Sequence, residues 1–295
     1  MKNIIVVTGG SGFVGSNLIK YLLIKTKNKI NSIDNYSSGS VNNHIKDKRI
    51  KYINSDTNNI AKKLGKFKKK IKVVFHFGEF ARIHQSFINT KDCFSSNISG
   101  TSNVFYFCLK NKIKIIYSAT SASLGNKGSD QSLSPYAFTK SKNLQLLNHL
   151  KKWFGLSYEA LYFYNVYGPG HIREGAMATV IGIFEKQYLS KKPLTVVRPG
   201  TQSRKFTHIN DTVKGCYYAW KKNKNRHYSL SHMRSYTIKK VATFFTKNTK
   251  MIPAKLGERK RSSTTKKIGK IKIYSFQCKT NLQSYIKEFK ENSNI

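Results

Sequence analysis

Residues 4–15 read IIVVTGGSGFVG, a short apolar run that leads directly into a cluster of glycines. An apolar run of this length indicates a buried strand, and the apolar residues at helical spacing after Gly15 indicate a helix. Glycines between the two allow a tight turn and let the backbone approach a pyrophosphate, to which the helix N-terminus offers N–H groups. This order predicts a dinucleotide-binding unit at the start of the chain.

Asp34 follows the next apolar run, Ile30–Ile33, and lies 19 residues after Gly15. An acid at this position accepts hydrogen bonds from both ribose hydroxyls and repels a 2′-phosphate. We therefore expect NAD in preference to NADP. Asp56 comes after a third apolar run, and two roles are open for it: contact with the adenine, or capping of a helix.

The first half of the chain alternates short apolar runs with helical stretches, as is typical of a parallel sheet covered on both faces. The predicted strands are Ile4–Val7, Ile30–Ile33, Ile50–Ile53, Val73–Phe77, Ile113–Tyr117 and Ser157–Phe163. Longer helices are expected at about 99–109 and 137–153. We predict an α/β fold with a Rossmann-type, doubly wound parallel sheet over residues 1–165, followed by a smaller substrate-binding lobe over 166–295.

The formal net charge of +41 at pH 7 would by itself suggest nucleic acid as a partner. Only nine of the 54 basic residues are Arg, whereas phosphate-binding surfaces favour Arg because its fork binds bidentately. The skew toward Lys indicates an A/T-rich coding bias. We therefore interpret the excess as a solvated coat of Lys and expect only non-specific binding of nucleic acid.

The four Cys residues are widely spaced, and the His residues form no ligand pattern with them. Neither a disulfide framework nor a metal site is predicted, and a reducing compartment fits. No apolar run approaches the roughly 18 residues of a membrane span. We expect a cytoplasmic chain that binds no metal and no membrane.

Residues 134–140 read SPYAFTK and place Tyr136 and Lys140 four positions apart. On a helix these positions share one face, so the Lys140 ammonium can lie close to the Tyr136 phenol. A positive neighbour stabilises a phenolate and makes it a usable base. Ser118 and Thr120 end a predicted strand, at the sheet edge where such folds bind their ligands. The pattern predicts a catalytic group.

Several motifs occur in order along the chain. They are Thr8–Gly15, Asp34, Asn97–Thr101, Ser118–Thr120, Tyr136 with Lys140, Tyr164–Pro169 and Arg204–Asp211. Through them, residues 3–260 resemble the NAD-dependent epimerase/dehydratase family, extended short-chain dehydrogenase/reductases that act on nucleotide sugars. Within that family the chain is most similar to UDP-glucose 4-epimerase-like proteins.

The resemblance implies roles by position. Tyr136 would be the acid and base, Lys140 would hold the nicotinamide ribose, and Thr120 would be the catalytic hydroxyl. The implied cofactor contacts are Gly9, Gly12, Phe13, Val14, Gly15, Asp34, Asn35, Asp56, Asn97, Ser118, Tyr136 and Lys140. The implied substrate contacts are Thr120, Asn165, Arg204, and Lys255 or Arg259. A segment at about 204–221 would return to the first domain, and the two long helices would form a homodimer.

The chain also departs from the family pattern. Ser121 and Ala122 stand where 4,6-dehydratases carry Asp-Glu, so dehydration lacks its proton-transfer pair. Lys205 stands where an Asp is common. In the loop after the fourth strand, Glu79 and Arg82 replace small residues. Arg82 is open to two interpretations: contact with a hexuronate carboxylate, or a structural pair with Glu79.

The expected activity is that of an NAD-dependent nucleotide-sugar epimerase inverting C4 of a UDP-hexose through a 4-keto intermediate. Two alternatives remain. One is epimerisation of a UDP-hexuronate or a UDP-N-acetylhexosamine. The other is a non-catalytic protein of the same fold that binds RNA through the Lys runs at 62–72 and 258–272.

Overall fold

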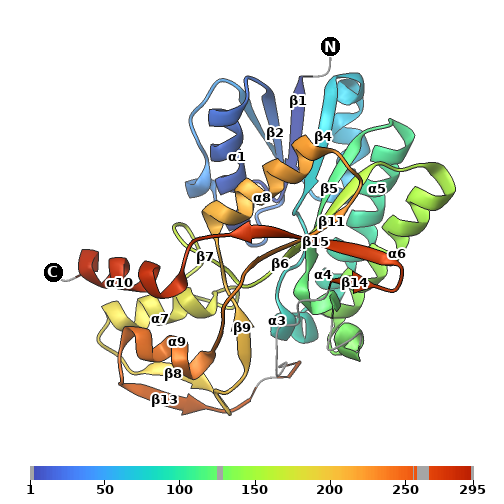
Figure 1. The fold of residues 1–295 in the computed structure, drawn as a ribbon. Helices are drawn as coiled ribbons and strands as arrows, with labels where there is room; N and C mark the ends of the chain where they lie inside the picture. The colour runs from blue at the N-terminus through green and yellow to red at the C-terminus, as the bar shows by residue number, and fades with distance from the viewer. Residues whose placement is uncertain (1–2, 125–128, 255, 258–265, 294–295) are drawn as a thin grey trace.

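A nine-stranded, mostly parallel sheet forms the centre of the computed structural model, which describes residues 3–124, 129–254, 256–257 and 266–293 (Figure 1). Its order is β14-β15-β11-β6-β5-β4-β1-β2-β3, and only β14 runs antiparallel to its neighbour. The strands are β1 (Ile4–Thr8), β2 (Lys29–Asp34), β3 (Ile50–Asn54), β4 (Ile71–His76), β5 (Lys114–Thr120), β6 (Tyr158–Phe163), β11 (His227–His232), β14 (Lys267–Ile268) and β15 (Ile271–Cys278). The strand order reverses between β1 and β4, so a crevice for ligand is expected at the carboxyl ends of these strands.

Alternate residues of β1 enter two separate cores. Ile4 and Val6 face the side covered by α2 (Ile60–Leu64), α5 (Thr101–Lys110) and α6 (Pro135–Phe154). Ile5 and Val7 face the side covered by α1 (Phe13–Lys25) and α8 (Ile209–Lys222). Because both faces of a strand inside a doubly wound sheet are buried, its sequence is continuously apolar.

A third core belongs to a smaller lobe, which lies below the sheet in Figure 1. Its helices are α7 (Val180–Leu189), α9 (Ile238–Phe245) and α10 (Leu282–Ser293). Its short strands pair as β13 (Thr249–Ile252) with β8 (Leu194–Val197), β12 (Ser235–Thr237) with β9 (Ser203–Lys205), and β10 (Thr207–His208) with β7 (Val166–Tyr167).

The predicted Rossmann-type α/β fold is confirmed, and all six predicted strands are present in the main sheet. Beyond residue 165 the chain passes between the two parts more than once, because α8, β11 and β15 also pack in or on the main sheet. The division into residues 1–165 and 166–295 stays a proposal.

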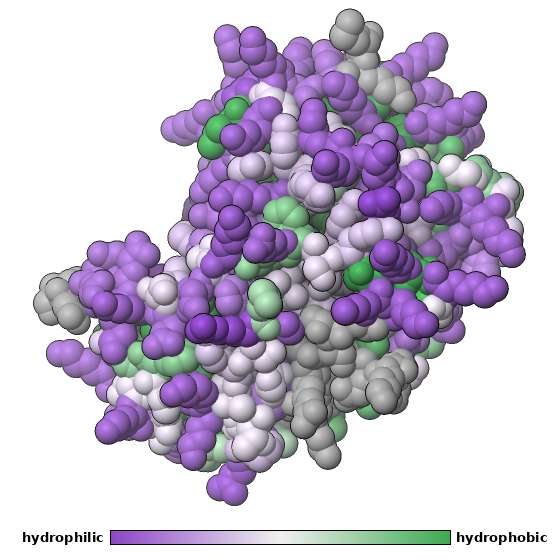
Figure 2. Space-filling model, viewed as in Figure 1, coloured by the Kyte–Doolittle hydropathy of each residue, from purple (hydrophilic) through white to green (hydrophobic). Residues whose placement is uncertain are grey.

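Two short helices and a π-helical turn complete the first part. They are α3 (Ile83–Ile88), α4 (Thr90–Phe94) and the turn Ser95–Gly100, which leads into α5. Within the described part of the chain, no helix is both long and apolar enough to cross a membrane. Hydrophilic side chains cover most of the face drawn in Figure 2, and hydrophobic residues appear there only in small patches.

Candidate active site

The glycine loop between β1 and α1 is shaped by close contacts that only glycine permits. Gly9 has φ +67°, and a Cβ there would lie 2.8 Å from the backbone of Phe77 and Gly78. At Gly15 a Cβ would lie 2.1 Å from the Gly9 carbonyl oxygen. Gly12 caps α1 without a side-chain hydrogen bond. The first N–H groups of α1 are therefore available to an anion.

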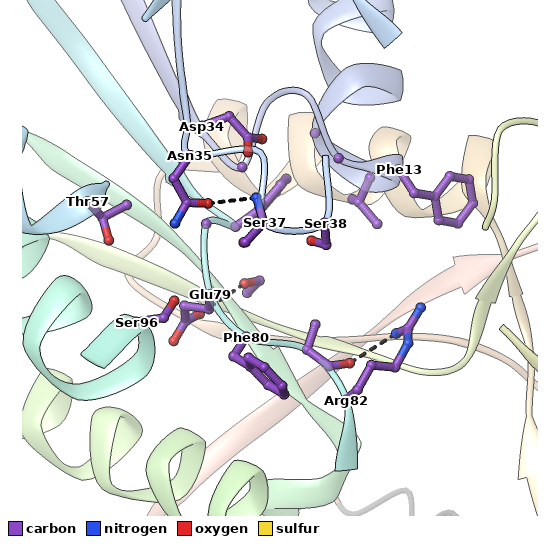
Figure 3. A pocket seen from close by; sticks show the side chains of 18 of the residues that line it. Phe13, Asp34, Asn35, Ser37, Ser38, Thr57, Glu79, Phe80, Arg82 and Ser96 are labelled. Carbon is purple, nitrogen blue, oxygen red and sulfur yellow. Dashed lines mark hydrogen bonds between the residues drawn. The ribbon is translucent and has the colours of Figure 1, made fainter. Parts of the chain in front are cut away.

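Asp34 lies at the end of β2, beside this loop (Figure 3). Its two carboxylate oxygens accept hydrogen bonds from the backbone N–H of Ser11 and of Tyr36, both at 2.9 Å. These bonds fix the carboxylate on the wall of the cavity. Each oxygen keeps further lone pairs, so it can also accept a hydrogen bond from a ligand hydroxyl.

Asp56 caps a short 3₁₀ turn, Thr57–Asn59. One carboxylate oxygen accepts from Asn58 N at 2.7 Å, and the other accepts from Asn35 Nδ2 at 3.2 Å. Both Asp56 and Asn35 also line the cavity. The structure thus shows the capping role, and contact with an adenine stays a prediction.

A single cavity brings the predicted cofactor and catalytic residues together. It runs along the carboxyl ends of β1, β2, β4 and β5, and it continues to the N-terminus of α6. The predicted residues that line it are Gly9, Gly12, Phe13, Val14, Gly15, Asp34, Asn35, Asp56, Ser118, Thr120, Tyr136 and Lys140.

Tyr136 is held in the first turn of α6. Ser134 Oγ caps this helix by accepting from Ala137 N at 3.1 Å, and Pro135 takes the first helical position. Tyr136 N donates to Ser86 Oγ at 3.2 Å, which ties the helix start to α3. At the end of β5, Thr120 Oγ1 accepts from Ala122 N at 3.2 Å and lies on the same cavity.

Lys140 lies one helical turn after Tyr136, and its side chain is only 4% exposed. Its Nζ contacts the Ser118 carbonyl oxygen and the Glu79 carboxylate, and lies 4.4 Å from the centroid of the Tyr117 ring. Burial lowers the pKa of Lys140, and Glu79 opposes part of that change. A buried ammonium thus has one carboxylate beside it.

Of the two interpretations of Arg82, the structural pair with Glu79 is not present, because Glu79 pairs with Lys140 instead. The Arg82 guanidinium points away from Glu79 in Figure 3. It donates from Nε and Nη2 to the Met177 carbonyl oxygen, at 3.0 and 2.5 Å, and from Nη1 to the Ala81 carbonyl oxygen at 3.0 Å. Both Glu79 and Arg82 line the cavity.

Asn97 lies behind the cavity wall, in the π-helical turn. Its side chain accepts from Phe80 N at 2.7 Å and donates to Phe80 O at 3.2 Å and to Thr139 Oγ1 at 3.1 Å. It therefore clamps the loop that carries Glu79 onto α6. Direct contact of Asn97 with a cofactor stays a prediction.

Two of the predicted substrate residues lie away from the described lining of this cavity. Asn165 follows β6 and donates from Nδ2 to the Lys205 carbonyl oxygen at 2.8 Å. Arg204 is buried in β9, and its Nη1 donates to the Ser203 carbonyl oxygen at 3.0 Å. Lys255 and Arg259 fall outside the described residues. Substrate contact stays a prediction for all four.

Comparison with known proteins adds an independent finding. The model of the NAD dependent epimerase/dehydratase family matches residues 5–231. An uncharacterised UDP-glucose epimerase of Bacillus subtilis is 31% identical over 228 residues, which cover 72% of this chain and 70% of that protein.

Solved structures have the same fold. UDP-glucose 4-epimerase of Thermotoga maritima, solved with UDP-glucose, superposes with a TM-score of 0.85 at 22% identity, over 98% of this chain and 99% of that one. A mutant UDP-glucuronic acid 4-epimerase of Bacillus cereus, solved with NAD and a fluorinated UDP-sugar, gives 0.82 at 23% identity, over 97% and 99% of the chains.

Proposed function

The chain belongs to the NAD-dependent epimerase/dehydratase family, and from this premise we propose that it inverts C4 of a UDP-hexose. NAD is the cofactor. The observation that carries the proposal is the cavity itself, which joins the glycine loop and Asp34 to Thr120, Tyr136 and Lys140. A protein that kept only the fold would not need a hydroxyl, a phenol and an ammonium at the far end of its cofactor cavity.

The described residues fit NAD. The uncapped N-terminus of α1 would hold the pyrophosphate, since its N–H groups carry the positive end of the helix dipole. Asp34 would accept from the adenosine ribose, and Lys140 would donate to the nicotinamide ribose. When bound, NAD would accept a hydride from the sugar and return it to the sugar within the same turnover.

In the proposed reaction, Tyr136 takes the proton of the C4 hydroxyl, with Thr120 in the hydrogen-bond path. The Lys140 ammonium stabilises the phenolate form of Tyr136. Oxidation of the sugar at C4 leaves a 4-keto sugar, which rotates in the site. After the other face of the C4 carbonyl has been reduced, Tyr136 returns the proton to the C4 oxygen. Retention of the cofactor follows from this cycle.

Dehydration is not proposed, because neither of the two residues directly after Thr120 carries a carboxylate. Ser121 and Ala122 form a buried 3₁₀ turn with Ser123 and Leu124. Elimination of water needs an acid and a base beyond Tyr136. The family name covers both reactions, and these two residues favour epimerisation.

A UDP-hexuronate is the second candidate substrate, and Arg82 is the observation that favours it. Its guanidinium lines the cavity that Tyr136 also lines, and its acceptors are backbone carbonyl groups. Among the described residues no carboxylate forms an ion pair with it. The carboxylate of a hexuronate would supply that charge.

The test is incubation of the purified chain with UDP-glucose, UDP-N-acetylglucosamine and UDP-glucuronate, with products identified by NMR. C4 inversion of UDP-glucose supports the first proposal. Inversion of UDP-glucuronate alone, lost in Arg82→Met, would favour the second candidate. Tyr136→Phe serves as the inactive control, and no inversion of any sugar would overturn both candidates.

We also propose that the chain is a cytoplasmic homodimer. The homodimer is supported by large apolar side chains exposed on α5 and α6.

A further inference from the structure

Glu79 is a buried carboxylate that the proposed reaction does not use. Its side chain is 3% exposed, and Oε2 pairs with Lys140 Nζ. Its other oxygen, Oε1, accepts from Thr101 Oγ1 and Tyr117 Oη, both at 3.0 Å, and from Asn143 Nδ2 at 3.2 Å. Donors from α5, β5 and α6 thus fix the carboxylate in one position at the wall of the cavity.

Lys140 needs such a partner because it is itself removed from water. A buried ammonium without a counter-charge tends to lose its proton. A carbonyl oxygen can accept a hydrogen bond from the ammonium, but only a carboxylate supplies a compensating negative charge. Burial lowers the pKa of Lys140, and the Glu79 carboxylate raises it again in part.

The other titratable groups that the described part of the chain places around this pair supply no negative charge near pH 7. Burial lowers the pKa of His76 on β4 to about 4 and raises that of Cys93 on α4 to about 11. The pKa of Tyr117 on β5 lies well above its usual value for the same reason. Tyr136 on α6 is the group on which the ammonium acts in the proposed reaction, and Arg82 interacts with Tyr136 as a further cation.

We propose that Glu79 is a positioning residue that keeps Lys140 charged and in place beside Tyr136. The working unit would then be Tyr136–Lys140–Glu79. The inference rests on the proposed function for the role of Tyr136, but the effect on Lys140 is independent of which sugar is bound.

The test is Glu79→Gln, which keeps the shape of the side chain and removes its charge. Affinity for NAD is measured by calorimetry in the full chain at a series of pH values. Without Glu79 the pKa of Lys140 falls further, so Lys140 loses its proton at lower pH. As the pH is raised, we therefore expect NAD affinity and the rate of epimerisation to begin to fall at a lower pH in Glu79→Gln than in the wild type.

Two controls separate charge from packing. Thr101→Val removes one donor to Glu79 but keeps the ion pair, so its pH profile should match the wild type. In a Lys140→Met background, Glu79→Gln should change NAD affinity less than twofold, because the group on which Glu79 acts is gone. If Glu79→Gln does not fold, Glu79→Asp takes its place, with a smaller shift in the same direction.

Superimposable pH profiles for wild type and Glu79→Gln would overturn the inference, and so would an equal loss of affinity in the Lys140→Met background. A shifted NAD profile in a chain that epimerises no sugar would support the ion pair and overturn the proposed function. Epimerisation together with an unshifted NAD-affinity profile would support the proposed function and overturn the inference about the ion pair.

Discussion

At the scale of single residues, the proposed site depends on a phenol and an ammonium separated by one turn of α6. Tyr136 lies on the cavity because the helix begins just before it, and Lys140, which also lines the cavity, pairs with Glu79. In the proposed mechanism the two side chains have different tasks: Tyr136 exchanges a proton with the C4 oxygen, and Lys140 supplies a positive charge that stabilises the phenolate.

Tyr136→Phe should abolish turnover while leaving the fold and NAD affinity nearly unchanged. The phenol is the group proposed to exchange a proton with the C4 oxygen, and loss of a positioned acid or base typically costs about 10²–10⁴ in rate. The measurement is product formation by NMR beside NAD binding by calorimetry. Near-wild-type epimerisation by Tyr136→Phe would contradict the mechanism.

Asp34→Ala should weaken NAD binding by about 10- to 100-fold, since hydrogen bonds to a charged group contribute about 1.5–3 kcal/mol. The substitution should also reduce the preference for NAD over NADP, because the charge that repels a 2′-phosphate is removed. Calorimetry with both dinucleotides measures this. Asp47→Ala, which removes a carboxylate that pairs with Arg49, is the control. A wild type that binds both dinucleotides equally would contradict this interpretation of Asp34.

At the scale of elements, the sequence predicted those strands, turns and helix starts that depend on the residue types within a short segment. The strands of the first half are visible because both faces of each inner strand are buried, so the whole run is apolar. The glycine loop and the start of α6 are visible because turns and caps need particular residue types. Helical spacing placed Tyr136 and Lys140 on one face of α6. Their proposed catalytic role rests in addition on the glycine loop and on the hydroxyls that end β5.

What could not be predicted depends on which segments meet in space. Glu79 and Lys140 are 61 residues apart, and nothing local distinguishes that pairing from one between Glu79 and Arg82. A signal was present in the sequence, because the loop after β4 carries a carboxylate, Glu79, and a guanidinium, Arg82, among small or apolar residues. Its partner depends on how α6 packs against that loop.

Ser134→Ala should lower the free energy of unfolding by about 1 kcal/mol, the usual effect of removing an N-cap hydroxyl. The hydroxyl accepts from Ala137 N and so defines the turn that carries Tyr136. Urea unfolding measures the loss. Ser37→Ala, at an exposed loop position, should be nearly neutral. Equal stability of both variants would show that the cap contributes nothing here.

At the scale of the whole molecule, the net charge of +41 should produce weak binding to nucleic acid. Hydrophilic side chains dominate the face shown in Figure 2. We expect dissociation constants of about 10⁻⁴–10⁻⁶ M at physiological salt. The affinity should fall as the salt concentration rises, and it should not depend on the nucleotide sequence. Fluorescence anisotropy with unrelated RNA oligomers at several salt concentrations tests this. Nanomolar, salt-resistant binding would instead support the RNA-binding alternative.

A homodimer through α5 and α6 is the last expectation, and the exposed side chains of these helices define it. Val104, Phe107, Leu144 and Leu147 are buried against the sheet, so they are not the contact residues. Other apolar residues of the same helices remain exposed: Tyr106 is 63% exposed and Trp153 is 59% exposed. The two helices lie side by side at one edge of the molecule (Figure 1).

If that edge is the interface, Tyr106→Lys with Trp153→Lys should shift the chain toward a monomer in light scattering at micromolar concentration. A charge placed in an apolar contact loses its water without gaining a partner. Met233→Lys is the matched control, because Met233 is 82% exposed between β11 and β12 and belongs to neither helix. A wild type that is monomeric at this concentration and fully active would remove the interface, and the exposed rings of α5 and α6 would then need another partner.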